Sequence, residues 1–156
     1  MQERCFQILY EYESGLVSKS ALVDWAIDMV LSGVETKSII LLSSLLGREL
    51  DRADELFRSS LFELNIDYPS KNDIRLYNAY IISSRIIHEK IQPNDGCAEL
   101  GALWHELDFP DILAEFGHLS HIQNDHENIG ITKESVVEDI IEAAYRFLKE
   151  YTDIFG

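Results

Sequence analysis

The segment from Asn72 to Gln92 constrains the fold more than any other part of this chain. Its apolar side chains fall on nearly every side of a helical wheel: Ile74, Leu76, Tyr77, Ala79, Tyr80, Ile81, Ile82, Ile86, Ile87 and Ile91. A surface helix shows one apolar stripe, whereas a helix that is apolar most of the way round is enclosed by other helices. We therefore predict a central helix at 72–92, ended by the turn at Pro93–Gly96.

The other segments also carry helical patterns. No stretch alternates apolar and polar residues with a period of two for long enough to indicate a strand. A chain of 156 residues with 46% hydrophobic content suits one domain with a sizeable core. We predict an all-α fold with a single domain at 1–156, in which about seven or eight helices form a compact orthogonal array around the central helix.

The charge is strongly unbalanced. The chain has 28 acidic and 13 basic side chains, which gives a formal net charge of -15. Such a field repels phosphate backbones and anionic lipids, so we expect neither nucleic-acid nor membrane binding. The same field accelerates the encounter with a basic partner protein, although it also serves solubility alone. Both interpretations of the charge stay open at this point.

Two cysteines, Cys5 and Cys97, lie far apart and belong to no CxxC pair. Isolated cysteines of this kind are typical of reduced, packed thiols in a cytosolic protein. The N-terminal run MQERCFQILYEYE is charged too early for a signal peptide. No apolar run reaches membrane-spanning length. We therefore expect a cytoplasmic protein.

Three of the five histidines lie within nine residues, at His118, His121 and His126. Histidines three apart on a helix share a face, and the following loop supplies the third imidazole. These residues are a candidate zinc or iron site. Their ordinary interpretation is a polar helix end, where histidine complements the helix dipole.

Two smaller groups of polar residues are also candidates. His105 lies beside Glu106 and Asp108, which is a possible acid/base set, although the sequence offers no nucleophile to accompany it. Asp24 and Asp28 are one turn apart on an otherwise apolar segment. They suit an acid/base pair, a site for a basic side chain, or simply the solvent edge of a buried helix.

The last segment, from Thr132 to Tyr151, is the cleanest amphipathic helix pattern. One side carries Val136, Val137, Ile140, Ile141, Ala144, Phe147, Leu148 and Tyr151, and we expect this side to face the core. Carboxylates before and along the other side form a negative strip that we predict as the partner-binding surface: Asp125, Glu127, Glu134, Glu138, Asp139 and Glu142.

Four runs resemble a group of small, poorly characterised bacterial helical proteins. The I-x-P-x-x-G turn is present at Ile91–Gly96, the Trp-Ala start at Trp25–Ala26, the S-x-x-x-L-x-x-L run at Ser38–Leu45, and the L-F-x-x-x-L-x-E-L-x-I segment at Leu56–Ile66. The resemblance implied by these runs extends over most of the chain. Such proteins are similar in size and charge to immunity proteins that neutralise bacterial toxins. The resemblance carries over no catalytic residue.

Our functional hypothesis is non-catalytic binding of another protein, in its sharpest form an immunity-type protein whose acidic face occludes a basic toxin. Because no GxSxG or phosphate-binding glycine loop is present, we do not expect an enzyme, and no cofactor is predicted. One alternative is a metal-dependent enzyme with a histidine site at 118–126. A further alternative is a structural or regulatory homo-oligomer, with a homodimer as its simplest form.

Overall fold

The computed structural model describes residues 2–155, with side chains from 4 to 153. Within this range all regular structure is helical, which confirms the predicted all-α class. Nine α-helices occur in the described residues: α1 (Gln2–Glu13), α2 (Lys19–Leu31), α3 (Lys37–Ser43), α4 (Ala53–Glu63), α5 (Lys71–Ile87), α6 (Pro93–Glu106), α7 (Ala114–Asn124), α8 (His126–Ile129) and α9 (Val137–Phe155). Three 3₁₀ helices join them: η1 (Gly47–Arg52), η2 (Asp111–Leu113) and η3 (Lys133–Val136). None of the described helices is long and apolar enough to cross a membrane.

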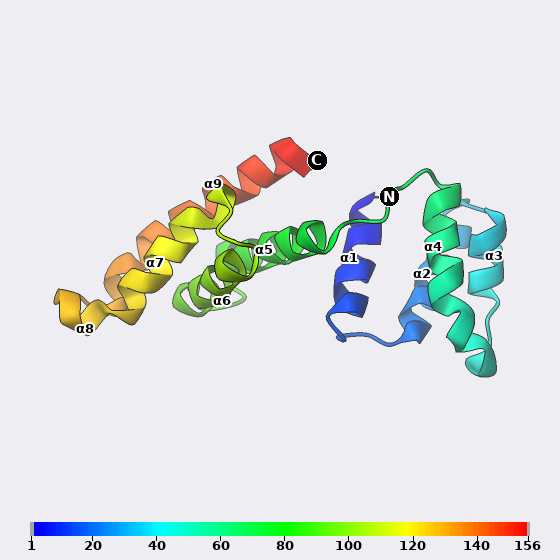
Figure 1. The fold of residues 1–156 in the computed structure, drawn as a ribbon, viewed down its shortest axis with the longest axis horizontal. Coiled ribbons are helices and arrows are strands. Elements are labelled where there is room, and N and C mark those ends of the chain that lie inside the picture. Colours follow the sequence, from blue (N-terminus) through cyan, green and yellow to red (C-terminus); the bar gives the residue numbers. More distant parts are fainter. Residues whose placement is uncertain (1, 156) are drawn as a thin grey trace. The chain divides into compact units, whose positions relative to one another are not determined.

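The contacts divide the chain after Ile74 into two compact units. The division falls inside α5, so one continuous helix belongs to both units. Figure 1 shows α1 to α4, in blue to cyan, and α6 to α9, in lighter green to red. The single domain at 1–156 stays a prediction. It requires that the two units unfold together.

The first unit is built around α2. This helix packs against α1, α3 and α4, and its core face includes Leu22 and Trp25. Trp25 meets Phe57 of α4 edge to face, with ring centroids 4.8 Å apart. Glu63, at the end of α4, accepts hydrogen bonds from the Ser38 amide (2.9 Å) and hydroxyl (2.7 Å) at the start of α3. A carboxylate 25 residues away therefore satisfies the N-terminus of α3.

Helix α5 is shielded from solvent over most of its length but is shorter than predicted, and its place at the centre of the other helices stays a prediction. Of its seventeen residues only Lys71, Asn72 and Arg85 are exposed. Ser70 and Asp73 cap its start, since the Ser70 amide donates to the Asp73 carboxylate (3.0 Å) and the Asp73 amide donates to the Ser70 hydroxyl (3.1 Å). The helix then ends at Ile87.

The predicted end of this helix at 92 was wrong, because the chain turns after Ile87 at residues that carry no turn signal in the sequence. Glu89 takes a left-handed conformation (φ 54°), and the Lys90 amide donates to the Arg85 carbonyl at 2.8 Å. No glycine marks this turn. Pro93 does not stop a helix here; it is the first residue of α6, where a missing amide hydrogen costs nothing.

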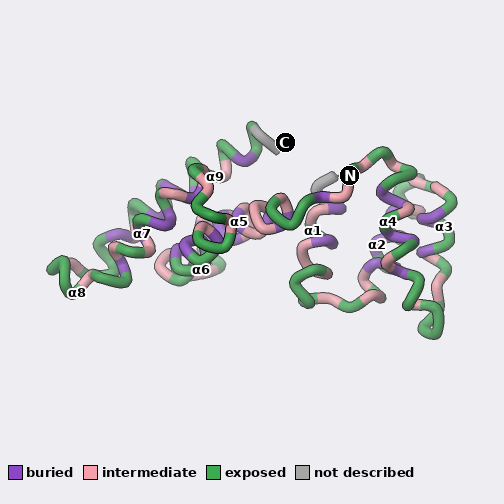
Figure 2. Tube along the Cα trace, viewed as in Figure 1, coloured by how far each residue is buried: buried purple, intermediate pink, exposed green. Residues whose placement is uncertain are grey.

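In the second unit α6 and α7 pack closely and run antiparallel. At one end Asn94 donates to the Gln123 side chain, whose own amide donates back to the Asn94 carbonyl, both at 2.9 Å. At the other end Gly117 faces the Trp104 ring so closely that an added Cβ would lie 2.1 Å from it. Helix α9 packs against both helices, and Figure 2 shows buried and exposed residues alternating along it.

Candidate functional site

The six predicted partner-binding carboxylates all lie on the surface of the second unit. Asp125 and Glu127 flank the start of α8, Glu134 lies on η3, and Glu138, Asp139 and Glu142 lie on the first turns of α9. Every one of them is exposed. Glu142 has one ion-pair partner, Arg146, at 3.9 Å. Among the described residues, the carboxylates of η3 and of the first turn of α9 form no ion pair, so their negative charge faces solvent.

Two apolar side chains interrupt this acidic surface. Ile141 is 40% exposed and Tyr145 is 66% exposed. They lie one turn apart on α9, on the same face as Glu138 and Glu142. The prediction that Ile141 faces the core was wrong. Four residues of α9, Glu138, Ile141, Glu142 and Tyr145, form what we call the outer patch.

The orientation of the outer patch follows from the opposite side of α9. There Ile140, Ala144 and Phe147 are buried, and the Phe147 ring meets Phe116 of α7 edge to face, with centroids 6.0 Å apart. A helix has 3.6 residues per turn, so the burial of 140, 144 and 147 turns 138, 141, 142 and 145 toward solvent or to the flanks. The predicted binding residues did not include Tyr145; its place one turn after Ile141 was the available signal.

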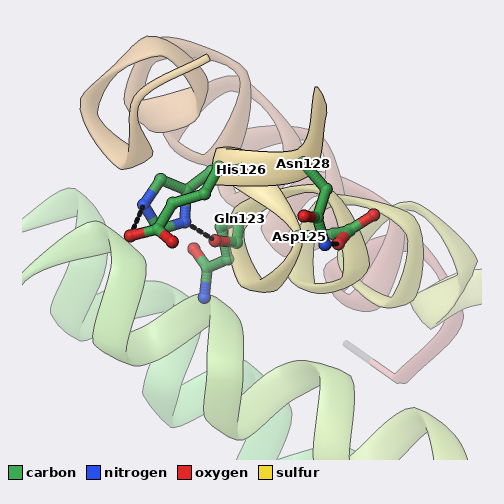
Figure 3. A network of polar contacts seen from close by, with 5 residues as sticks. Gln123, Asp125, His126 and Asn128 are labelled. Carbon is green, nitrogen blue, oxygen red and sulfur yellow. Dashed lines mark hydrogen bonds and ion pairs between the residues drawn. The ribbon is translucent and has the colours of Figure 1, made fainter. Parts of the chain in front are cut away.

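The three histidines of the predicted metal site do not converge. The His126 Nδ1 atom bonds to the Gln123 carbonyl at 2.8 Å, and its Nε2 atom lies 3.9 Å from Glu127, as Figure 3 shows. His118 and His121 lie exposed on α7. In the part of the chain that the structure describes, no three His, Cys, Asp or Glu side chains are grouped so as to hold a metal ion.

Two of these histidines meet a different partner, Trp104 of α6. Its ring centroid lies 5.9 Å from that of His118 and 6.4 Å from that of His121. His105 lies 5.2 Å from Trp104 and 5.8 Å from His121. Phe109 completes the group, 4.8 Å from Trp104. We call these five residues the ring cluster.

The backbone around the ring cluster is unusual. Asp108 and Phe109 are consecutive non-glycine residues in the left-handed region, with φ of 59° and 61°. Each such residue costs about 1 kcal/mol or more, and the conformation persists only where surrounding contacts impose it. Here it follows the end of α6 and holds the Phe109 ring against Trp104 and His105. Pro110 then precedes η2.

This arrangement also bears on the acid/base hypothesis for His105. Glu106 lies 3.5 Å from Arg75 of α5, so its carboxylate is directed to an ion pair. His105 contacts aromatic rings and the imidazole of His121. None of the described contacts joins His105 to Glu106 or Asp108 as an acid/base pair.

Asp24 and Asp28 lie on the rim of an open groove of about 380 Å³ between α1 and α2. Both carboxylates are exposed, while Trp25 and Met29, each the next residue after one of them, are buried. Arg4 lines the same groove, so it carries charges of both signs. This placement is the solvent edge of a mostly buried helix, one of the interpretations above.

The two cysteines are free, buried thiols, one in each unit. Burial raises the pKa of Cys5 to about 11 and the pKa of Cys97 to about 12. Both side chains are therefore neutral thiols at physiological pH and have little nucleophilic thiolate. Both cysteines therefore serve as packing residues, and neither is given a reactive role.

The fold and these surfaces define a class: a small, acidic, all-helical protein with an acidic patch on its last helix. The chain belongs to DUF2247, a family described as uncharacterised proteins conserved in bacteria, whose model matches residues 5–152. No curated protein and no solved structure matches the chain. The resemblance to a poorly characterised bacterial group is thereby confirmed at the level of the family.

Proposed function

We propose that this protein is a non-catalytic binding module that docks a basic partner protein on the outer patch of α9. The observation that carries the proposal is the exposure of Ile141 and Tyr145 between the carboxylates of Glu138 and Glu142. Binding energy at protein interfaces concentrates in a few central residues, among which tyrosine is enriched, surrounded by a polar rim. The outer patch has this composition.

The charge around the patch supports a basic partner. Residues 75–156 contain fifteen acidic and six basic side chains. A surface of one sign accelerates association with a partner of the opposite sign and makes the rate depend on salt. Association of two copies through the same patch would place like charges opposite each other, which disfavours a homodimer through this surface.

The sharpest form of the proposal is an immunity protein. In this mechanism the acidic face covers the basic active site or substrate groove of a toxin, and occlusion requires no catalytic group. The net charge of -15 and the exposed patch support it. The partner to be tested is the product of a toxin gene adjacent to the gene for this protein.

The experiment measures the affinity and association rate of that partner at several salt concentrations. Tyr145→Ala should weaken binding at least about tenfold, the effect of losing an interface anchor. A Glu138→Gln, Glu142→Gln double variant should slow association and flatten its salt dependence. Phe62→Ala, which removes an aromatic side chain 82% exposed in the first unit, is the matched control and should bind as wild type.

Two results would contradict the proposal. Tight binding that is unchanged between low and high salt would refute the electrostatic mechanism. Equal losses for Tyr145→Ala and Phe62→Ala would show that the outer patch is not the docking surface. Light scattering of the protein alone addresses the homo-oligomer alternative, and a dimer disrupted by Tyr145→Ala would favour that alternative.

A further inference from the structure

The five histidines fall into two groups by their hydrogen bonds. The His88 Nδ1 atom bonds to the Ser84 carbonyl at 2.8 Å, and His126 bonds to Gln123 in the same way. Each of these imidazoles is occupied by a backbone carbonyl three or four residues before it. The side chains of His105, His118 and His121, by contrast, make no hydrogen bond or ion pair among the described residues, so their ring nitrogens are available to a ligand.

His105 and His121 come from facing helices and lie beside each other. Their ring centroids are 5.8 Å apart, with ring planes at 83°. A zinc–imidazole bond is about 2.0–2.1 Å long, so two imidazoles on one ion have centroids roughly 5 to 6 Å apart. The observed separation of 5.8 Å falls within this range, and it is also that of two rings packed edge to face.

The space next to the two imidazoles suits a hydrated ion. Both line a pocket of about 230 Å³ between α6 and α7. Its other walls are small or polar: Ala98, Gly101, Ala102, Gly117, Ser120 and Asn124. Asn124 follows His121 by three residues, which places its side chain on the same helix face. Its amide oxygen is a further hard ligand, and water can occupy the remaining positions.

We propose that His105 and His121 bind a divalent transition-metal ion in this pocket, with Zn²⁺ as the reference ion and Asn124 and water as additional ligands. This site differs from the one at His118, His121 and His126. It keeps His121, replaces His118 and His126, and takes its second imidazole from α6. Neither imidazole donates to a carboxylate, the contact that usually strengthens histidine ligands. The ion is therefore expected to exchange, unlike the zinc of a closed structural site.

The test is calorimetric titration of the full, tag-free, metal-free chain with zinc chloride. One equivalent of Zn²⁺ should bind. His105→Ala and His121→Ala should each weaken Zn²⁺ binding at least about tenfold. Replacing a residue that only hydrogen-bonds to a metal ligand already lowers metal affinity by about this factor. His118→Ala and His126→Ala are the matched controls and should retain wild-type affinity. All four positions lie on the surface or near it, and circular dichroism confirms that each variant is folded.

A second readout reports the location of the ion. Trp104 lies 5.2 Å from His105 and 6.4 Å from His121, so bound Cu²⁺, which is paramagnetic, should broaden the indole NMR signal of Trp104. Trp104→Phe identifies that signal. The broadening should disappear in His105→Ala and persist in His126→Ala. Loss of Zn²⁺ binding in His118→Ala or His126→Ala with retention in His105→Ala would overturn the proposal, as would the absence of saturable binding in the wild type.

Discussion

Gly117→Ala is the substitution whose effect the structure predicts most directly. Gly117 lies on α7 where that helix crosses α6. An added Cβ would lie 2.1, 2.4 and 2.6 Å from three carbon atoms of the Trp104 ring. Contacts below 3.0 Å do not persist in folded proteins, so either the ring or a helix must move. Trp104 is half-buried, and a displaced ring would lose its contacts with the ring cluster.

Two opposing effects determine how far Gly117→Ala changes the free energy of unfolding. Overpacking of this kind costs about 1 to 3 kcal/mol, and the 2.1 Å approach places the cost at the upper end of the range. Replacing a helical glycine by alanine contributes about 1 kcal/mol of stability. We therefore expect Gly117→Ala to lower the free energy of unfolding by about 2 kcal/mol. For a chain of this size each kcal/mol lowers the melting temperature by roughly 3 °C.

The assay is urea unfolding followed by tryptophan fluorescence and circular dichroism. In a Trp104→Leu background the same glycine substitution should be neutral or stabilising, because the clash is gone and the helix propensity remains. Gly47→Ala is the matched control, since a Cβ there meets nothing within 4 Å. A Gly117→Ala protein as stable as wild type in the presence of Trp104 would refute the assigned packing of α6 and α7.

Three further predictions concern the core and its titratable groups. Ile82 is 2% exposed, so Ile82→Asp should lower the free energy of unfolding by about 3 kcal/mol or more, and circular dichroism should show that its unit unfolds. The apolar pattern predicts the same outcome for Ile81, but Ile81 is only partly buried and should tolerate aspartate better. Because burial raises the pKa of Cys97 from 9.0 to about 12, the contribution of Cys97 to folding stability should be constant below pH 9 and fall as the pH rises from 9 toward 12. A thiol reagent at pH 8 should label Cys97 only in urea. Hydrogen bonds from Thr36 and Ser38 lower the pKa of Glu63, so its contribution should be present above pH 4.5 and be lost as the pH falls further; Glu63→Gln should abolish that part of the acid dependence measured by urea unfolding.

The sequence was sufficient for the helical class and for the inner faces of the helices. Ile140, Ala144 and Phe147 are buried as their spacing predicts, and so are Ile74, Tyr77, Ile82 and Ile86 of α5. Such predictions succeed because burial follows the 3.6-residue repeat, which is a local property of the chain. The predicted carboxylates are likewise all exposed, since charged side chains rarely leave water without a partner.

The 3.6-residue repeat of apolar side chains was not enough to predict where α5 ends or which residues form the outer patch. Glu89 takes a conformation that favours glycine, and only its surroundings hold it there. Ile141 lies at the boundary between the two faces of α9, where the repeat alone does not decide exposure; packing against α6 and α7 does.

The sequence by itself determined an acidic, all-helical chain whose buried faces and charged faces can be read from residue spacing. Only the tertiary structure decided which histidines meet. His118 and His126 are neighbours of His121 in the sequence, yet His105 is the imidazole that lies beside it, because α6 and α7 cross where Gly117 admits the Trp104 ring. Contacts between helices depend on the crossing and register of two surfaces, and neither quantity is a local property of the chain.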